Sequence, residues 1–222
     1  MQAPGWRRRR VFSGALAALA VLALGSTSAK PAAAASAGCT EHILEAEREL
    51  EIPRGLLLSM SLVESGQSGV PQPLAMNVNG KTVYPDSLDE ARRHLLDGRG
   101  NLRSAVIAGC MQLSVQHHRT AFKPIERVLD PAANVWYAAR YLKRLRADSG
   151  NWGAAVARYN GGSRSQQQSY MCRIGQHLAV LEKDNADLLD SRRCGQMESP
   201  SIAPETRRAF RRSQVASADV SR

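Results

Sequence analysis

One carboxylic acid in this sequence stands where its charge is hard to maintain. Glu64 follows the stretch 56–63, Leu-Leu-Leu-Ser-Met-Ser-Leu-Val, which is so apolar that a helix over 54–65 is expected to be buried. Burial disfavours a carboxylate, and so does the negative end of a helix dipole, so both raise the pKa of Glu64. A carboxyl group with a pKa near neutrality can act as a general acid and then as a base. The helix alone fits equally well a structural glutamate that pairs with an arginine or caps backbone groups.

Two later strings carry groups that could surround such an acid. They are Gly109-Cys110-Met111-Gln112-Leu113 and Ala157-Arg158-Tyr159-Asn160-Gly161-Gly162. With Glu64-Ser65 they follow the order that lytic transglycosylases of the goose-lysozyme-like group, glycoside hydrolase family 23, show as Glu-Ser, Gly-Leu-Met-Gln and Ala-x-Tyr-Asn-Gly. The chain resembles this family over roughly residues 39–165 and the helix that follows them.

The resemblance implies a fold and a reaction. The fold would be mainly α, a lysozyme-like (goose-type) helical domain with a small β-hairpin insertion. The family cleaves the β-1,4 bond between N-acetylmuramic acid and N-acetylglucosamine of peptidoglycan and leaves 1,6-anhydromuramyl ends. Most glycosidases use two carboxylates, whereas this family uses one. Glu64 would be that catalytic residue, and no cofactor or metal is implied.

The resemblance also implies substrate-binding roles for the residues that match the family's signatures. These are Ser65, Gly109, Met111, Gln112, Tyr159 and Asn160. Gln112 is expected to hydrogen-bond the glycan, and the Tyr159 hydroxyl to face the glutamate or the acetamido group. Ser65 also fits a cap of the helix end and Met111 a core position. Asn160 is expected to order the turn behind it.

Four cysteines set a constraint of their own: Cys39, Cys110, Cys172 and Cys194. An even number in an exported chain favours two disulfides, and the residues alone leave three pairings open. Cys110 stands where the family signature has leucine. In that light we expect Cys39 to pair with Cys110 and Cys172 with Cys194.

A second departure from the family is the length of chain between Glu64 and Gly109. The insertion, residues 66–108, carries a hairpin signal at Asn79-Gly80 and a helix start at Ser87. It resembles a subgroup of transglycosylases that are secreted or associated with flagella or secretion systems. Asn77 and Tyr84 are candidates for additional glycan contacts within it.

Caps and periodicity predict the elements that position these groups. Helices are expected over 41–50, with Thr40 as N-cap, over 54–65, from Ser87 to a stop at Gly98, from Asp130-Pro131 to Gly150, over 152–159 and over 171–189. A polar loop is expected over 163–169. The fold class predicted is therefore mainly α with one small hairpin.

The two ends of the chain differ in composition from its middle. Arg7 to Arg10, the apolar run 11–24 and the small residues at 35–37 are typical of an export signal peptide over residues 1–37. The catalytic domain is expected over 38–195 and a disordered basic tail over 196–222. The protein would be exported, periplasmic or secreted, by the Sec or the twin-arginine route, and would keep no stable membrane span after cleavage.

The net charge and the composition limit the classes of partner that the protein is expected to bind. The net charge is +10, but outside the signal region 25 basic residues face 20 acidic ones. Aromatic residues make up 5% and the arginines are scattered, which argues against nucleic-acid binding. The expected partner is peptidoglycan, and a secretion, pilus or flagellar assembly is left open. We expect a monomer.

Two other functions compete with the transglycosylase. A lysozyme-type hydrolase on the same fold would need a second carboxylate to position water, for which Asp86, Asp89 and Asp130 are available. A non-catalytic glycan-binding or scaffold module would not need Glu64.

Overall fold

The computed structural model describes residues 38–189, 194–195 and 198–219, so the predicted signal peptide lies outside the described residues. The α-helices are α1 (Cys39–Glu49), α2 (Leu56–Ser65), α3 (Leu88–Leu95), α4 (Val115–His118), α5 (Pro131–Ser149), α6 (Trp152–Asn160), α7 (Arg164–Leu181) and α8 (Pro204–Asp219). The short 3-10 helices are η1 (Arg119–Ala121), η2 (Ile125–Leu129) and η3 (Lys183–Leu188). The strands are β1 (Gly66–Gln67), β2 (Val70–Pro71), β3 (Met76–Val78), β4 (Lys81–Val83), β5 (Val106–Ala108) and β6 (Leu113–Ser114).

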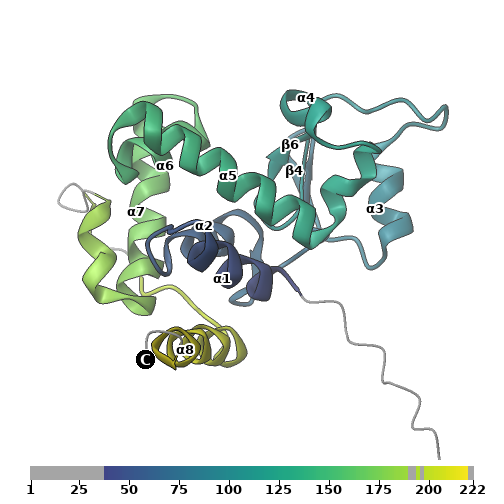
Figure 1. The fold of residues 1–222 in the computed structure, drawn as a ribbon. Helices are drawn as coiled ribbons and strands as arrows, with labels where there is room; N and C mark the ends of the chain where they lie inside the picture. The colour runs from purple at the N-terminus through teal and green to yellow at the C-terminus, as the bar shows by residue number, and fades with distance from the viewer. Residues whose placement is uncertain (1–37, 190–193, 196–197, 220–222) are drawn as a thin grey trace, which may run out of the picture. The chain divides into compact units, whose positions relative to one another are not determined.

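Helix α2 lies at the centre of the described domain. Every residue from Leu56 to Leu62 is buried, including Ser59 and Ser61. A helix that is apolar all round must have neighbours on all sides, and α2 packs against α1 and α7 (Figure 1). The expected buried helix is confirmed. It starts two residues later than predicted because Gly55 adopts a left-handed conformation, with φ 82°.

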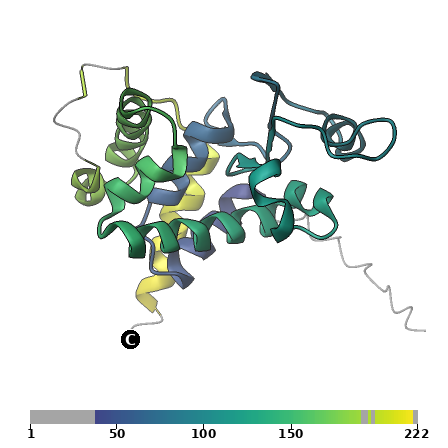
Figure 2. The ribbon, with the colours of Figure 1, turned by 90° about the horizontal axis from the view of Figure 1, so that it is seen from above.

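Helix α5 extends along the domain and links its two ends. Asp130 accepts a hydrogen bond from the Ala133 backbone N–H at 2.7 Å, and Gly150 ends the helix with φ 80°. The predicted helix start at Asp130-Pro131 and the predicted end at Gly150 are both confirmed. The sheet and α3 lie towards the start of α5, whereas α6 and α7 lie towards its end (Figures 1 and 2).

The insertion and the residues that follow it contain more sheet than the sequence suggested. Asn79 and Gly80 both have positive φ, 52° and 83°, as a type I′ turn requires, and β3 pairs with β4 as predicted. However, β5 and β6 extend this hairpin into a four-stranded antiparallel sheet, in the order β4-β3-β5-β6. These two strands are three and two residues long, too short for alternation to reveal them. Residues 109–112 form the turn between them.

Several helix boundaries differ from the prediction. Helix α1 starts at Cys39 with Gly38 as its N-cap, so the expected Thr40 cap is wrong. Helix α3 begins as expected, where Ser87 accepts the Glu90 backbone N–H, but it ends at Leu95, before Gly98. The predicted polar loop over 163–169 is wrong, because Ser163 and Gln166 form a reciprocal capping box and α7 starts at Arg164. Helix α7 ends at Leu181, and η3 occupies the rest of the predicted last helix.

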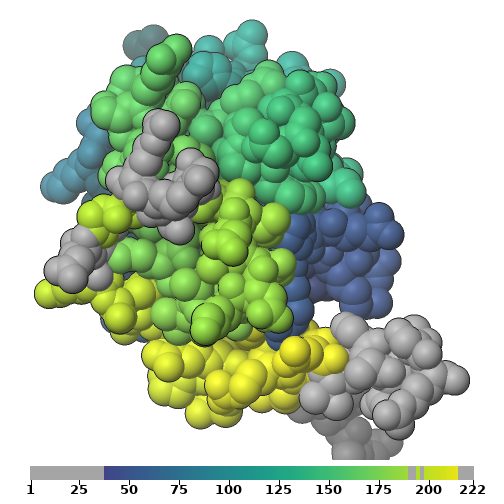
Figure 3. Space-filling model, turned by 90° about the vertical axis from the view of Figure 1, so that its left-hand side faces the viewer, coloured from purple at the N-terminus to yellow at the C-terminus, as the bar shows by residue number. Residues whose placement is uncertain are grey.

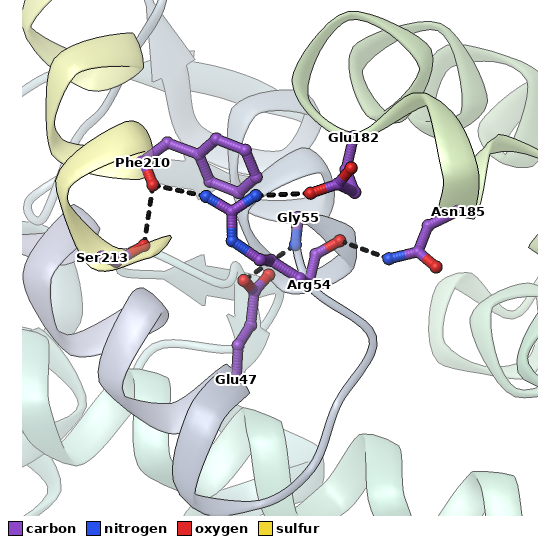
Figure 4. Close-up of polar contacts among 7 residues, drawn as sticks. All are labelled: Glu47, Arg54, Gly55, Glu182, Asn185, Phe210 and Ser213. Carbon is purple, nitrogen blue, oxygen red and sulfur yellow. Dashed lines mark hydrogen bonds and ion pairs between the residues drawn. The ribbon is translucent and has the colours of Figure 1, made fainter. Parts of the chain in front are cut away.

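The predicted disordered tail is also wrong for the described residues. Helix α8 lies within it, and Ile202 and Phe210 are buried against the rest of the domain. Arg54, before α2, places its guanidinium 3.6 Å from the centre of the Phe210 ring and donates to the Phe210 carbonyl at 2.6 Å (Figure 4). It also donates to the Glu182 carboxylate. The folded domain therefore extends past residue 195, because buried apolar side chains and the Arg54 contacts hold α8 to the preceding part of the chain.

Figure 3 shows α8 along the lower edge of one face, beneath the segment that follows α7. Among the residues that the structure describes, none of the helices combines the length and the apolar character needed to cross a bilayer.

Two disulfides connect distant parts of the chain. Cys39 at the start of α1 bonds Cys110 in the β5–β6 turn, and Cys172 in α7 bonds Cys194. This is the pairing expected from the resemblance, and it is confirmed. The first disulfide ties the start of α1 to the β5–β6 turn, and the second ties α7, which carries Tyr170, to residue 194.

Candidate active site

Glu64 is the penultimate residue of α2, and one side chain from another helix holds its carboxyl group. The Tyr170 hydroxyl, from α7, donates to Glu64 Oε1 at 2.5 Å. Tyr170 is 1% exposed, whereas Glu64 is only partly buried. Burial raises the pKa of Glu64 to about 7, against smaller lowering effects of the Tyr170 hydrogen bond and the Arg173 charge. The carboxyl group is therefore poised between its two protonation states at neutral pH.

Ser65 faces away from solvent. It is 1% exposed, and its Oγ lies 2.8 Å from the carbonyl oxygen of Cys110 and 3.2 Å from that of Ser61. The Ser61 hydroxyl donates to the same Cys110 carbonyl at 2.8 Å. The two serines attach the end of α2 to the β5–β6 turn. The geometry thus favours the helix-end interpretation of Ser65 over contact with the substrate.

The β5–β6 turn is organised by Asn134, a residue that the sequence analysis missed. Its Oδ1 accepts the Met111 backbone N–H at 2.9 Å, while its Nδ2 donates to the carbonyls of Ala108 and Val128 at 3.0 and 2.9 Å. Gly109, with φ 86°, passes so close that a Cβ would lie 2.2 Å from Asn134 Nδ2. The glycine is therefore required by the close approach of the Asn134 side chain. An amide inside an otherwise apolar helix face was the available signal.

Met111 and Gln112 differ in what they can reach. The Met111 side chain is fully buried, which supports its interpretation as a core residue. Gln112 is half-buried, and its Nε2 lies 2.8 Å from the Ala75 carbonyl and 3.0 Å from that of Gly109. Its donor is engaged by backbone, which leaves the side-chain oxygen to accept a bond from a ligand.

Tyr159 and Asn160 end helix α6. The Tyr159 hydroxyl donates to the Met111 carbonyl at 2.8 Å, so in this structure it braces the turn instead of bonding Glu64. Burial raises the Tyr159 pKa, and the negative charge of Glu64 adds to this effect. Asn160 is exposed and donates to the Gly161 carbonyl at 3.0 Å, as expected of a residue that orders the turn.

Tyr170 is the second residue that sequence reasoning missed. It lies between the predicted loop over 163–169 and the predicted helix over 171–189, and 106 positions separate it from Glu64. A tyrosine in a helix is more often a packing residue, and only the fold brings its hydroxyl to the carboxyl group.

A row of aromatic rings leads away from Tyr159 along α5. Tyr159 and Tyr141 have ring centroids 5.7 Å apart, Tyr141 and Tyr137 6.5 Å, and His118 lies 5.3 Å from Tyr137. All four side chains are partly exposed. Flat apolar faces beside a polar edge are suited to sugar rings, so the row is a candidate binding surface.

Of the two candidates from the insertion, Asn77 has a local role and Tyr84 is exposed. Asn77 Oδ1 accepts the Gly80 backbone N–H at 2.9 Å and so stabilises the hairpin turn, and Tyr84 is 40% exposed. Within the described part of the chain, no group of three or more His, Cys, Asp and Glu side chains is arranged to hold a metal ion.

One comparison with known proteins bears on this geometry. The family model described as Transglycosylase SLT domain matches residues 41–171. The matched range begins in α1 and ends just after Tyr170, so it includes the carboxyl group, its tyrosine partner and the β5–β6 turn. No curated protein and no solved structure matches the chain.

Proposed function

Because the chain belongs to the transglycosylase SLT family, and is thus a peptidoglycan lytic transglycosylase that works outside the cytoplasm, we propose that Glu64 alone supplies its acid and base. One observation carries this proposal. The Glu64 carboxyl is partly exposed at a helix end, has a pKa of about 7 and is held by a single hydroxyl donor.

In the first step Glu64 acts as an acid. The Tyr170 hydroxyl occupies Oε1, which leaves Oε2 to carry the proton. Protonated Glu64 donates this proton to the glycosidic oxygen between N-acetylmuramic acid and N-acetylglucosamine, and the bond from that oxygen to the anomeric carbon breaks. The acetamido oxygen of the substrate stabilises the positive charge that develops at the anomeric carbon.

In the second step the same carboxylate acts as a base. It takes the proton from the O6 hydroxyl of the muramic acid as that oxygen bonds the anomeric carbon. The products are a 1,6-anhydromuramyl end and a free 4-hydroxyl group, and no water is consumed. A residue that gives and then recovers one proton is most effective when its pKa lies near the ambient pH, as the burial of Glu64 ensures.

The surroundings of Glu64 favour this scheme over hydrolysis. A hydrolase would need a second carboxylate, and Asp86, Asp89 and Asp130 were the candidates. All three are exposed, Asp89 pairs with Arg92, and Asp130 caps α5. The charge that acts on the Glu64 pKa is that of Arg173, which is positive.

Substrate contacts follow from the same geometry. We assign the side-chain oxygen of Gln112 to a sugar hydroxyl or amide N–H, and the row Tyr159, Tyr141, Tyr137 and His118 to the faces of successive sugars. Ser65, Gly109 and Met111 support the site from behind, because they hold the β5–β6 turn against α2.

The experiment compares products from purified peptidoglycan after digestion by the wild type, Glu64→Gln and Glu45→Gln. Glu45 is an exposed glutamate on α1 and serves as the matched control. Mass spectrometry should find anhydromuramyl ends, each lighter by one water than a hydrolysed end, with the wild type and Glu45→Gln only. Reducing muramyl ends from the wild type would contradict the transglycosylase mechanism, and equal activity of Glu64→Gln would contradict the role of Glu64.

The finer biological setting is also a proposal. The strings around Asn79-Gly80 and Gly109-Cys110 resemble those of transglycosylases that are secreted or serve flagella or secretion systems. They support a role in local opening of the wall for such an assembly, after export by the signal over 1–37.

A further inference from the structure

A pocket lies beside the end of α2 that carries the candidate catalytic residue. It has a volume of about 470 Å³, and its lining includes Val63 from α2, Arg173 and His177 from α7, and Glu198 and Pro200 from the segment before α8. Val63 precedes Glu64 in the chain, and the Arg173 charge acts on the Glu64 pKa. The pocket and the carboxyl group are therefore neighbours.

The wall made by Glu198 and Pro200 lies beyond the family match, which ends at residue 171. It is held at both ends. The Cys172–Cys194 disulfide ties the segment to α7 at one end. At the other end the Ala203 N–H and the Thr206 hydroxyl both donate to the Gly69 carbonyl, at 3.1 and 3.0 Å.

Gly69 shows how closely this wall is fitted. With φ 78°, it sits so near the segment that a Cβ would lie 2.4 Å from the Ala203 nitrogen and 2.8 Å from the Ile202 Cα. The turn between β1 and β2, which follows the catalytic helix, is thus shaped to receive the C-terminal segment. The pocket is a constructed part of this chain rather than an accident of a loose tail.

The pocket presents opposite charges. Arg173 and Glu198 are both exposed, and in the described part of the chain neither takes part in an ion pair. His177 donates through Nδ1 to the Arg173 carbonyl at 2.9 Å, so its neutral ring offers Nε2 as an acceptor. A guanidinium binds a carboxylate through two parallel hydrogen bonds, and a carboxylate binds an ammonium group. The chemistry suits a ligand with both groups.

We propose that this pocket binds the stem peptide of the peptidoglycan strand, with a stem carboxylate at Arg173 and the free amino group of the diamino acid at Glu198. The inference rests on the proposed function. The muramic acid at the scissile bond carries the stem on its lactyl group, so the peptide leaves the sugar close to Glu64. Stems whose amino group is already crosslinked would lose the contact with Glu198, and the enzyme would prefer uncrosslinked strands.

The test uses the full processed protein and two substrates. One is soluble uncrosslinked glycan strands that carry stem peptides, and the other is the same strands after an amidase has removed the stems. The readout is the ratio of kcat/KM for the release of anhydromuramyl ends from the two substrates. A ratio cancels any direct effect of Arg173 on Glu64.

We expect the wild type to favour stem-bearing strands by about 10-fold, a preference shared between the two charged contacts. Arg173→Gln and Glu198→Gln should each lower this ratio, and the double variant should bring it close to one. Arg208→Gln removes the same charge from the exposed face of α8 and should leave the ratio as in the wild type.

Three outcomes would overturn the inference: a wild-type ratio near one, a preference for stripped strands, or a preference that survives both pocket variants. In each of these cases anhydro ends from stripped strands would still support the proposed function. If no substrate yields anhydro ends, the proposed function fails instead, so the two failures are distinguishable.

Discussion

Two glutamates stand at opposite ends of helix α2, and burial raises the pKa of each to about 7. Glu47, from α1, accepts the backbone N–H groups of Gly55 and Leu58 at 2.9 Å each, at the start of α2 (Figure 4 shows the bond to Gly55). It is 4% exposed. Glu64, at the other end, is partly exposed and accepts one bond from Tyr170.

The two carboxyl groups differ in how many of their oxygens already accept hydrogen bonds. Both oxygens of Glu47 are used by the backbone, and the positive end of the α2 dipole favours its charge. Glu64 has one oxygen without such a bond in the described structure and faces the negative end of the same dipole. A perturbed pKa alone therefore does not identify a catalytic acid. Access and an uncommitted oxygen must accompany it.

The largest expected effect separates the two residues by activity. Glu64→Gln should lower kcat by about 10²–10⁴-fold, because general acid–base catalysis contributes that much. Glu47→Gln, assayed well below its melting temperature, should keep kcat within a few-fold of the wild type. Steady-state release of soluble muropeptides measures both. A comparable loss of kcat in a folded Glu47→Gln protein would erase the distinction.

For stability, Glu47 should be the more important of the two glutamates. Glu47→Ala leaves the buried N–H groups of Gly55 and Leu58 without an acceptor, which should lower the free energy of unfolding by about 3 kcal/mol. Glu45→Ala, on the exposed side of α1, should change it by less than about 0.5 kcal/mol. Urea denaturation followed by circular dichroism provides the values. If Glu47→Ala proves as stable as Glu45→Ala, the anchor role of Glu47 is refuted.

Tyr170→Phe tests whether the Tyr170 hydrogen bond acts on the pKa of Glu64. The tyrosine hydrogen bond lowers the Glu64 pKa, so its removal should raise that pKa further above its usual value. Since the reaction needs protonated Glu64, the basic limb of the kcat/KM profile should move to higher pH, with a rate loss of about 10-fold, or 1.4 kcal/mol. A basic limb that stays in place or moves to lower pH would speak against the contact.

The smallest effect concerns stability and pH. The folded pKa of Glu64 lies above its unfolded value, so the unfolded chain releases this proton first and stability falls as the pH rises from about 4.5 to about 7. Glu64→Gln lacks this loss. At pH 8 it should be more stable than the wild type by about 1 kcal/mol, a figure reduced for partial exposure, and near pH 4.5 the two should converge. Thermal melts at both pH values test the sign.

Local signals predicted much of the frame. Asn79-Gly80 predicted the hairpin, Asp130-Pro131 and Gly150 the bounds of α5, and the apolar run before Glu64 a buried helix. Each of these depends on neighbours within a few positions. The short strands β5 and β6 were missed because only pairing creates them, β5 with β3 and β6 with β5. Helix α8 was missed because its contacts reach back to Arg54.

The candidate site was predictable only in part, because many of its contacts join residues that are far apart in the sequence. The family resemblance singled out Glu64 and the residues around it, but it assigned to the substrate several groups that the structure uses internally. Gly109 accommodates Asn134, and Tyr159 braces the Met111 carbonyl. Asn134 bonds Met111 across 23 positions and Tyr170 bonds Glu64 across 106, and no local pattern marks such distances.

The two disulfides also determine when the site can be complete. Cys110 lies in the turn that Ser61 and Ser65 hold, and Cys172 follows Tyr170 by two residues. In a reducing compartment thiols stay unpaired, so a newly made chain would lack the covalent support of both the turn and the tyrosine helix. A peptidoglycan-cutting enzyme that works outside the cytoplasm would then gain its full activity only after it has left the place of its synthesis.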